Sequence, residues 1–351
     1  MHVLIAPDSY KGSIPAHDAA TALARGWSRT RPRDTVARLP VADGSDGTVD
    51  VLARAVPGAI RVPVPDVTGP DGRPLDAEWL HLPDGTAVVE LARVGGLPLT
   101  AEPDPLGAHT IGLGELMAAA LAESPSRLVV AVGDAAATDG GTGALRALGA
   151  RFLDAFGTEL PPGAAHLTRL HRVELDDLPE FPRIDVLVDV DHTLKEAPTT
   201  GNHATPHEAK LLSTALTRLA EALPHPQIPG TGAAGGTAYG LAAALDARLT
   251  PGADFVGTLL DLPAHLAQAD LVITGEGAYD ATSQRGKAVG HILTLARTTP
   301  KALVAGRLDI PPPPVPTVTL VSLATRRAAA FTHPVPHLHT AAAILARTLH
   351  P

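Results

Sequence analysis

Short apolar runs rich in Val, Ile and Leu alternate along this chain with alanine-rich amphipathic segments, and this alternation is typical of an α/β protein. Near the N-terminus the pattern predicts strands over 3–6 and 35–41 and helices over 17–28 and 50–55. The last third predicts strands over 271–274, 302–305 and 318–321 and helices over 289–297 and 341–349. Both chain ends are therefore expected to build one parallel sheet.

The middle of the chain has a different pattern. From about residue 61 to 89, Pro and Gly alternate with Val, which predicts short, hairpin-rich β structure. Further strands are predicted over 128–132 and 185–190, and helices over 206–223 and 241–248. The predicted fold class is α/β, with a parallel-sheet domain built from both chain ends, 1–62 and 250–351, and a second, mixed α/β domain inserted at 63–249.

Composition narrows the function classes. Of 351 residues, 45% are hydrophobic but only 3% are aromatic, so Ala, Val, Leu and Ile must build the core. The absence of cysteine excludes disulfides, thiolate metal sites and cysteine nucleophiles. A net charge of −9 argues against nucleic acid as the main partner, although a local cationic pocket can hold an anionic small molecule. Without a membrane-length apolar run or a signal-peptide pattern, we expect a soluble, cytoplasmic protein.

Four glycine-rich turns that carry acids follow predicted strands, at 7–13, 42–48, 133–141 and 273–287. Ligands of open parallel sheets bind at the carboxyl ends of strands, where carboxylates hold Mg²⁺ while backbone N–H groups, Lys and Arg hold phosphate. One such turn is ordinary turn chemistry, since Gly and Asp populate turns for backbone reasons alone. Four together predict a phosphate-handling enzyme, although the chain has neither a Walker A loop nor a GxGxxG motif.

Five long motifs carry a resemblance to a known family. They are APDSYKGSIPA, LPVADGSDGT, DPLGAHTIGLGEL, PGTGAAGGTAYGL and LVITGEGAYDATSQRGKA. In this order they resemble segments of the bacterial two-domain glycerate kinases, the glycerate 2-kinases, over nearly the whole chain. The resemblance implies a flavodoxin-like domain joined to a second α/β domain, an active site in the cleft between them, and ATP-dependent phosphorylation of a hydroxyl of glycerate with Mg²⁺.

The residues that match the family motifs are the candidate site. The catalytic acids are provisionally Asp43, Asp139, Asp191, Glu276 and Asp280, with Asp191 and Glu276 also as metal ligands. Asp191 is favoured over Asp189 because it lies nearer the carboxyl end of its strand. The candidates for binding substrate or phosphate are Ser9, Lys11, Asp46, Thr138, Gly140, Gly141, Gly235, Gly236, Ser283, Arg285 and Lys287.

The chain also departs from the family pattern. Where the family has GGSATND, residues 133–139 are GDAAATD, so two hydroxyls are lost and an acid, Asp134, is gained. The family's Gly-Pro-Gln-Lys-Gly element is absent; Thr200, Gly201, Asn202 and His203 stand near its place, and Lys195 is left as a substitute cation. Thr282 replaces a Gln of the fourth motif, and Asp46 replaces a Glu of the second.

These departures keep two alternatives open. One is a family member with a different hydroxylated substrate, as in a specialised biosynthetic pathway, for which His192 and His203 are candidate contacts. The other is a catalytically inactive homologue that serves as a binding or regulatory module. The expected partners are a small hydroxy acid or related metabolite and a nucleotide, and a homodimer is left open. His333, His337 and His339 are expected in a solvated, proline-broken loop rather than in a zinc site.

Overall fold

The structure, a computed structural model, describes residues 1–199 and 204–349. The chain divides into two compact units. Unit 1 contains Met1–Asp43, Asp50–Ala55 and Gly252–Pro351, and unit 2 contains Gly44–Val49 and Val56–Pro251. Thr200, Gly201, Asn202 and His203, which the sequence places near the missing family element, lie outside the described residues.

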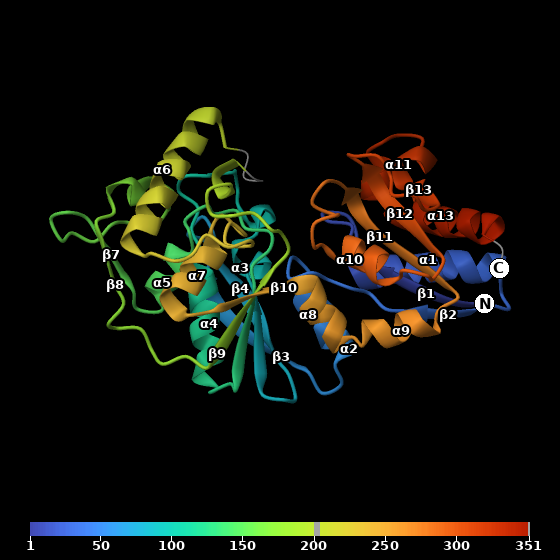
Figure 1. Cartoon of the computed structure of the whole chain (residues 1–351), viewed down its shortest axis with the longest axis horizontal. Helices are drawn as coiled ribbons and strands as arrows, with labels where there is room; N and C mark the ends of the chain where they lie inside the picture. Colours follow the sequence, from blue (N-terminus) through green and yellow to red (C-terminus); the bar gives the residue numbers. More distant parts are fainter. Residues whose placement is uncertain (200–203, 350–351) are drawn as a thin grey trace. The chain divides into compact units, whose positions relative to one another are not determined.

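Unit 1 is built on a sheet in which every neighbouring pair of strands is parallel (Figure 1). Its strand order is β13 (Thr317–Thr319), β12 (Lys301–Leu308), β11 (Leu271–Tyr279), β1 (His2–Pro7) and β2 (Thr35–Arg38). The helices of unit 1 are α1 (Ala16–Thr30), α2 (Thr48–Ala55, whose first two residues belong to unit 2), α8 (Gly252–Leu259), α9 (Leu262–Gln268), α10 (Ala288–Leu295), α11 (Leu320–Leu323), α12 (Ala329–Thr332) and α13 (Pro334–Thr348).

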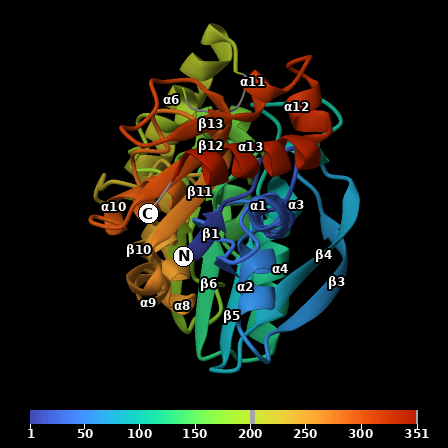
Figure 2. The ribbon, with the colours of Figure 1, turned by 90° about the vertical axis from the view of Figure 1, so that its right-hand side faces the viewer.

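Helices cover both faces of this sheet. Because side chains alternate along a strand, β12 sends Ala302 and Val304 into one core and Leu303 and Ala305 into another. The first core includes residues of α1 and α13, which pack against each other (Figure 2), and the second includes Val289 of α10. A parallel sheet from both chain ends with helices on both faces confirms the predicted fold class.

Unit 2 contains a mixed sheet. Its order is β10 (Arg248–Pro251), β9 (Arg183–Val188), β6 (Arg127–Ala131), β5 (Thr86–Glu90), β4 (Pro74–His81) and β3 (Ile60–Thr68). The pairs from β10 to β5 are parallel, and β5–β4 and β4–β3 are antiparallel, which confirms the predicted hairpin-rich segment. A small antiparallel pair joins β7 (Arg151–Leu153) and β8 (Arg172–Glu174).

The helices of unit 2 enclose its main core, in which Leu113, Leu128, Val186 and Leu216 are fully or nearly fully buried. The α-helices are α3 (Ala92–Gly95), α4 (Ile111–Ala122), α5 (Thr142–Ala147), α6 (Pro206–Ala222) and α7 (Thr237–Leu245), and the 3-10 helices are η1 (Leu97–Leu99), η2 (Ala164–Arg169) and η3 (Ala197–Thr199). Helix α6 begins with a capping box in which the Thr205 side chain and Glu208 exchange hydrogen bonds. No helix in the described ranges is both long and apolar enough to cross a membrane.

Strand β11 extends beyond its predicted end at residue 274. The stretch from Gly275 to Tyr279, expected to be a glycine-rich turn, is strand, and Glu276 pairs in register with Ala305 of β12. The glycines of this stretch allow neighbouring backbone to approach closely and do not form a turn. A Cβ on Gly275 would lie 2.1 Å from the carbonyl oxygen of Val304, so only glycine fits beside β12 there.

Helix α13 corrects a second expectation. It begins at Pro334, so His337 and His339 lie in a helix and not in a proline-broken loop. Proline is tolerated in the first helical turn because the N–H that it lacks has no intrahelical partner there. In unit 2, α7 ends at Leu245 and β10 follows, where the sequence predicted one helix over 241–248.

Candidate functional site

The candidate residues fall into two groups, one in each unit. Unit 1 carries Ser9, Lys11, Asp43, Glu276, Asp280, Ser283, Arg285 and Lys287. Unit 2 carries Asp46, Thr138, Asp139, Gly140, Gly141, Asp191, Gly235 and Gly236.

In unit 1, acids gather where the parallel strands end. Asp8 directly follows β1, Asp43 lies five residues beyond β2, and Glu276 lies in the last part of β11. Parallel strands end at the same edge of a sheet, so these side chains are neighbours. Asp43 is 1% exposed, and its Oδ2 accepts a hydrogen bond of 3.2 Å from the backbone N–H of Ala288, the first residue of α10. A carboxylate at a helix N-terminus also meets the positive end of the helix dipole.

The pKa of Glu276, another acid of this edge, is strongly raised. Burial raises the pKa of Glu276 to about 8; Asp43 and Asp280 push in the same direction, while the hydrogen bond from Ser283 and the charge of Lys287 oppose it. Within the described structure, its buried Oε1 has no hydrogen-bond partner. A buried carboxyl oxygen without a partner is costly unless it is protonated or meets a cation. Glu276 can therefore hold a proton or a cation.

Asp8 belongs to the same electrostatic group, although the sequence analysis did not select it. Burial and the charge of Asp43 raise the pKa of Asp8 well above its ordinary value; Glu276 adds to the rise, and a bond from Ser9 N and the Lys287 charge oppose it. The Ser9 N–H donates to Asp8 Oδ1 over 2.6 Å. The signal was available in the sequence, because Asp8 is the first acid after the first predicted strand.

Asp280 forms a compact turn after β11. Its Oδ1 accepts bonds from the N–H and hydroxyl of Thr282, at 2.7 and 2.5 Å, and from Ser283 N at 3.2 Å. Burial raises the pKa of Asp280, but the Thr282 hydroxyl and the charge of Lys287 outweigh burial and lower it overall. Thr282, which replaces a family Gln, is thus part of the turn. The cations Lys11 and Arg285 are exposed, and Lys287 is half-buried at the start of α10.

In unit 2, Asp139 is fully buried and its carboxylate is engaged by hydrogen bonds. Oδ2 accepts from the N–H and hydroxyl of Thr110, at 3.0 and 2.9 Å, and from Gly143 N at 3.0 Å. Oδ1 accepts from Gly141 N at 3.0 Å. These bonds tie the loop before α5 to the segment before α4 and satisfy N–H groups at the start of α5.

The candidate glycines bring two loops into backbone contact. Gly140 N donates to the carbonyl oxygen of Gly235 over 3.1 Å. Gly235 has a φ of +61°, and a Cβ there would lie 2.2 Å from the carbonyl oxygen of Ala137. Gly141 and Gly236 also have positive φ, at +77° and +84°. Thr138 is fully buried between these loops. These glycines thus allow the backbones of the two loops to pack closely against each other.

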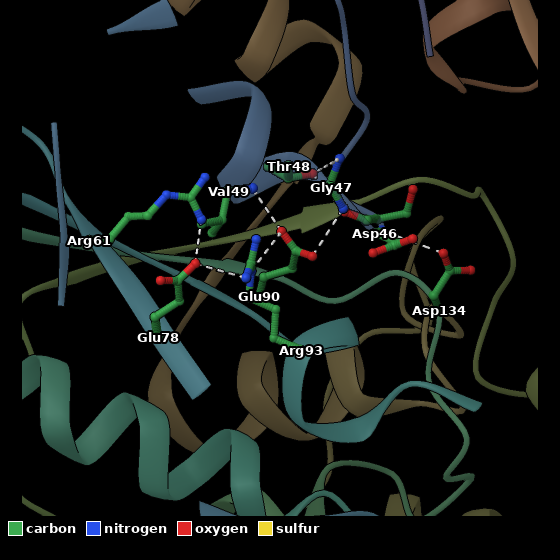
Figure 3. Close-up of polar contacts among 11 residues, drawn as sticks. Asp46, Gly47, Thr48, Val49, Arg61, Glu78, Glu90, Arg93 and Asp134 are labelled. Atoms are coloured by element: carbon green, nitrogen blue, oxygen red, sulfur yellow. Dashed lines mark hydrogen bonds and ion pairs between the residues drawn. The ribbon is translucent and has the colours of Figure 1, made fainter. Parts of the chain in front are cut away.

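The loop that carries Asp46 is held by acids of unit 2 (Figure 3). Glu90, the last residue of β5, accepts from Gly47 N at 3.0 Å and from Val49 N at 2.7 Å. Asp134 Oδ2 accepts from Asp46 N at 3.4 Å. Glu90 was not among the residues selected from the sequence. Its signal in the sequence is an acid that ends the apolar run TAVVE. In the structure, every residue of this run is buried.

Asp191 lies three residues beyond the end of β9 and is exposed, whereas Asp189 is 9% exposed. The strand, predicted over 185–190, ends at Val188, so both acids lie beyond it. His192 follows Asp191, and its carbonyl oxygen accepts from Gly230 N and Gly232 N, at 3.1 and 2.8 Å. His203, the other histidine predicted for a changed substrate, lies outside the described residues.

Comparison with known proteins supplies the family. A family model described as the glycerate kinase family matches residues 3–349. The chain belongs to the glycerate kinase family. The predicted resemblance is thereby confirmed, and so is the predicted enzyme class, a phosphotransferase with an alcohol group as acceptor.

Several relatives in the glycerate kinase family match over most of their length. The chain is 38% identical over 307 residues to a glycerate kinase of Bacillus subtilis (strain 168), covering 82% of this chain and 79% of the relative. It is 35% identical over 325 residues to a glycerate 2-kinase of Escherichia coli (strain K12), covering 87% and 84%. A crystal structure from Salmonella typhimurium LT2, assigned as glycerate kinase 2, is similar with a TM-score of 0.76, 34% identity and 99% and 98% coverage.

Proposed function

We propose that this chain is an ATP-dependent kinase that transfers the γ-phosphoryl group of ATP to a hydroxyl of glycerate. Membership of the glycerate kinase family supports the reaction class. The observation that carries the proposal is the group of buried acids beside Lys287 at the carboxyl edge of the unit 1 sheet. Phosphoryl transfer needs such a combination, because a base must meet the hydroxyl while cations balance the phosphate charge.

In the proposed reaction, the acceptor hydroxyl oxygen bonds to the γ-phosphorus and the bond to the β–γ bridging oxygen breaks, which releases ADP. The hydroxyl proton passes to a carboxylate. Asp139 is poorly suited because hydrogen bonds occupy its oxygens, and Glu276, with a pKa of about 8, carries its proton at neutral pH. Asp280 has a lowered pKa and is a weak base. Asp43 and Asp191 remain as proton acceptors.

Anion binding in this proposal falls to the cations and hydroxyls around the same edge. Lys287 lies close enough to Asp8 and Glu276 to lower the pKa of both. Lys11 and Arg285 are exposed and can reach phosphate or a substrate carboxylate, and Ser9 and Ser283 add hydroxyl groups. Arginine and lysine beside phosphate offset the negative charge that the acids alone would repel.

The residues also fit Mg²⁺. No cluster of three or more His, Asp or Glu arranged for a metal occurs in the described part of the chain. Kinases commonly hold Mg²⁺ with one or two carboxylates and with substrate phosphates. In unit 1, Glu276, with its unpartnered buried oxygen, would exchange its proton for the ion, and Asp191 is a separate candidate ligand in unit 2. When bound, Mg²⁺ would neutralise charge on the phosphates.

The test is turnover of glycerate with ATP and Mg²⁺, followed by ADP release and by phosphorus NMR of the product. We expect ADP and phosphoglycerate in equal amounts. Asp43→Asn should lower kcat by about 10²- to 10⁴-fold, whereas Asp18→Asn, at an exposed acid of α1, should not change it. Turnover of another hydroxylated metabolite but not glycerate would replace the substrate. Failure to bind Mg-ATP in calorimetry would instead indicate an inactive homologue.

A further inference from the structure

The backbone around Asp46 is held from both sides by carboxylates of unit 2 (Figure 3). Asp134 Oδ2 accepts from the Asp46 N–H, which belongs to the peptide bond before Asp46. Glu90 Oε1 accepts from the Gly47 N–H, which belongs to the peptide bond after it. The two acids therefore orient both peptide planes that determine where the Asp46 side chain points.

Glu90 contributes more to this arrangement than one bond. Its second oxygen, Oε2, accepts from Val49 N in the first turn of α2, so one carboxylate bridges the loop and a helix start. Gly47 between them has a φ of +93°, a conformation that side-chain-bearing residues rarely adopt. Glycine has many other conformations open to it, so contacts such as those from Glu90 favour this one.

We propose that Glu90 is a positioning residue that holds Gly47 and Val49 so that Asp46 faces the acceptor substrate. This inference rests on the proposed function and takes Asp46, a candidate for binding substrate or phosphate, as the residue that contacts the acceptor. Glu90 itself is 1% exposed at the end of β5, so it acts through the loop and not by touching the substrate.

The charges around Glu90 make its action sensitive to pH. Arg93 Nε lies 3.9 Å from Glu90 Oε2, and Arg93 is shared with Glu78, which also pairs with Arg61. On the side of Glu90 that faces the loop, the charged group is Asp46. Burial raises the pKa of Glu90 to about 7; Arg93 and the two N–H bonds oppose the rise, and Asp46 adds to it.

Only the ionised carboxylate offers acceptors alone at both oxygens. Protonation places an O–H opposite one backbone N–H, so one of the two bonds is lost and the loop loosens. The pKa is raised, so Glu90 is ionised above about pH 7 and protonated below it. The acceptor KM should therefore rise as the pH falls through 7, with little change in the KM for ATP.

The experiment compares wild type with Glu90→Gln and with Glu115→Gln. Glu115 is a matched control: it lies in unit 2 and accepts from the N–H and hydroxyl of Thr68, away from the loop. We expect Glu90→Gln to raise the acceptor KM by about 10- to 100-fold and to remove the pH dependence near 7. Glu115→Gln should leave both unchanged.

Hydrogen exchange gives a readout that does not depend on catalysis. In wild type, protection of the Gly47 and Val49 amides should fall as the pH drops from 8 to 6, after correction for intrinsic exchange, and Glu90→Gln should abolish this change. Constant protection in wild type would overturn the inference, even if Glu90→Gln fails to fold. If protection varies with pH as expected but the chain lacks glycerate kinase activity, the proposed substrate is wrong. The role of Glu90 in holding the loop would still stand.

Discussion

Replacing Asp139 by Asn separates a structural role for this acid from a catalytic one. In the folded chain, one oxygen of Asp139 accepts from Thr110 N, the Thr110 hydroxyl and Gly143 N, and the other accepts from Gly141 N. Asn can keep its carbonyl oxygen toward Thr110 and Gly143. Its NH₂ group then faces the N–H of Gly141, so two donors oppose each other in a fully buried position.

The magnitude follows from these contacts. One charge-assisted bond is lost, one buried N–H is left without an acceptor, and the bonds that remain lose the carboxylate charge. Together these effects should lower the free energy of unfolding of unit 2 by about 2–4 kcal/mol. A domain stable by roughly 5–15 kcal/mol would still fold, but its urea midpoint would fall by about 1 M.

The assay can report on each unit separately, because the chain has two tryptophans, Trp27 in unit 1 and Trp79 in unit 2. Fluorotryptophan labelling gives each unit its own ¹⁹F signal during urea unfolding. The Trp79 transition should move in Asp139→Asn, and the Trp27 transition should not. Asp154→Asn is the matched control, since Asp154 accepts from Phe156 N and Thr158 N in an open turn of unit 2.

The opposite pattern would refute the reasoning. If Asp139 is a catalytic base, Asp139→Asn should lower kcat by about 10²- to 10⁴-fold without moving either unfolding transition. An unchanged Trp79 midpoint would therefore show that the buried hydrogen bonds do not hold the loop. A shifted midpoint with kcat preserved in the folded fraction would establish the structural role alone.

Two further substitutions test packing and charge. Gly235→Ala should destabilise unit 2 by at least about 2 kcal/mol more than Gly72→Ala, because both positions have positive φ but only a Cβ at Gly235 meets backbone within 2.2 Å; equal urea midpoints would contradict this. Burial raises the pKa of Asp185, but bonds from Arg127 and a second arginine outweigh it and lower the pKa. The ionised Asp185 carboxylate stabilises the folded chain above about pH 4, and this stabilisation is lost as the pH falls further. The difference in free energy of unfolding between wild type and Asp185→Asn should therefore close between pH 5 and 2. A constant difference would argue against an electrostatic origin.

Local pattern was sufficient for most elements. The strand over 3–6 and the helix over 206–223 were predicted within a few residues, because apolar periodicity is a property of adjacent residues. The boundaries failed where distant backbone decided them. Gly275 lies in β11 and not in a turn because its backbone pairs with Pro7 of β1 and with Val304 of β12, and β12 lies about thirty residues further along the chain.

Site residues divide in the same way. The motifs alone identified Glu276 and Asp43 as acids after strands, because order along the chain determines which strand end each follows. Their protonation states do not follow from their order along the chain. The pKa of Glu276 rises to about 8 through burial first, with Asp43 and Asp280 adding to it, and burial exists only in the folded chain.

By itself, the sequence determined the α/β fold class, the family and the candidate acids, since periodicity and long motifs are local features. Only the tertiary structure decided what each acid does. Asp139 is engaged by hydrogen bonds from Thr110 and from the loop before α5, and Glu90 holds a loop more than forty residues earlier in the chain. The physical reason is that a carboxylate is defined by the donors and charges it meets, and folding brings these from distant parts of the chain.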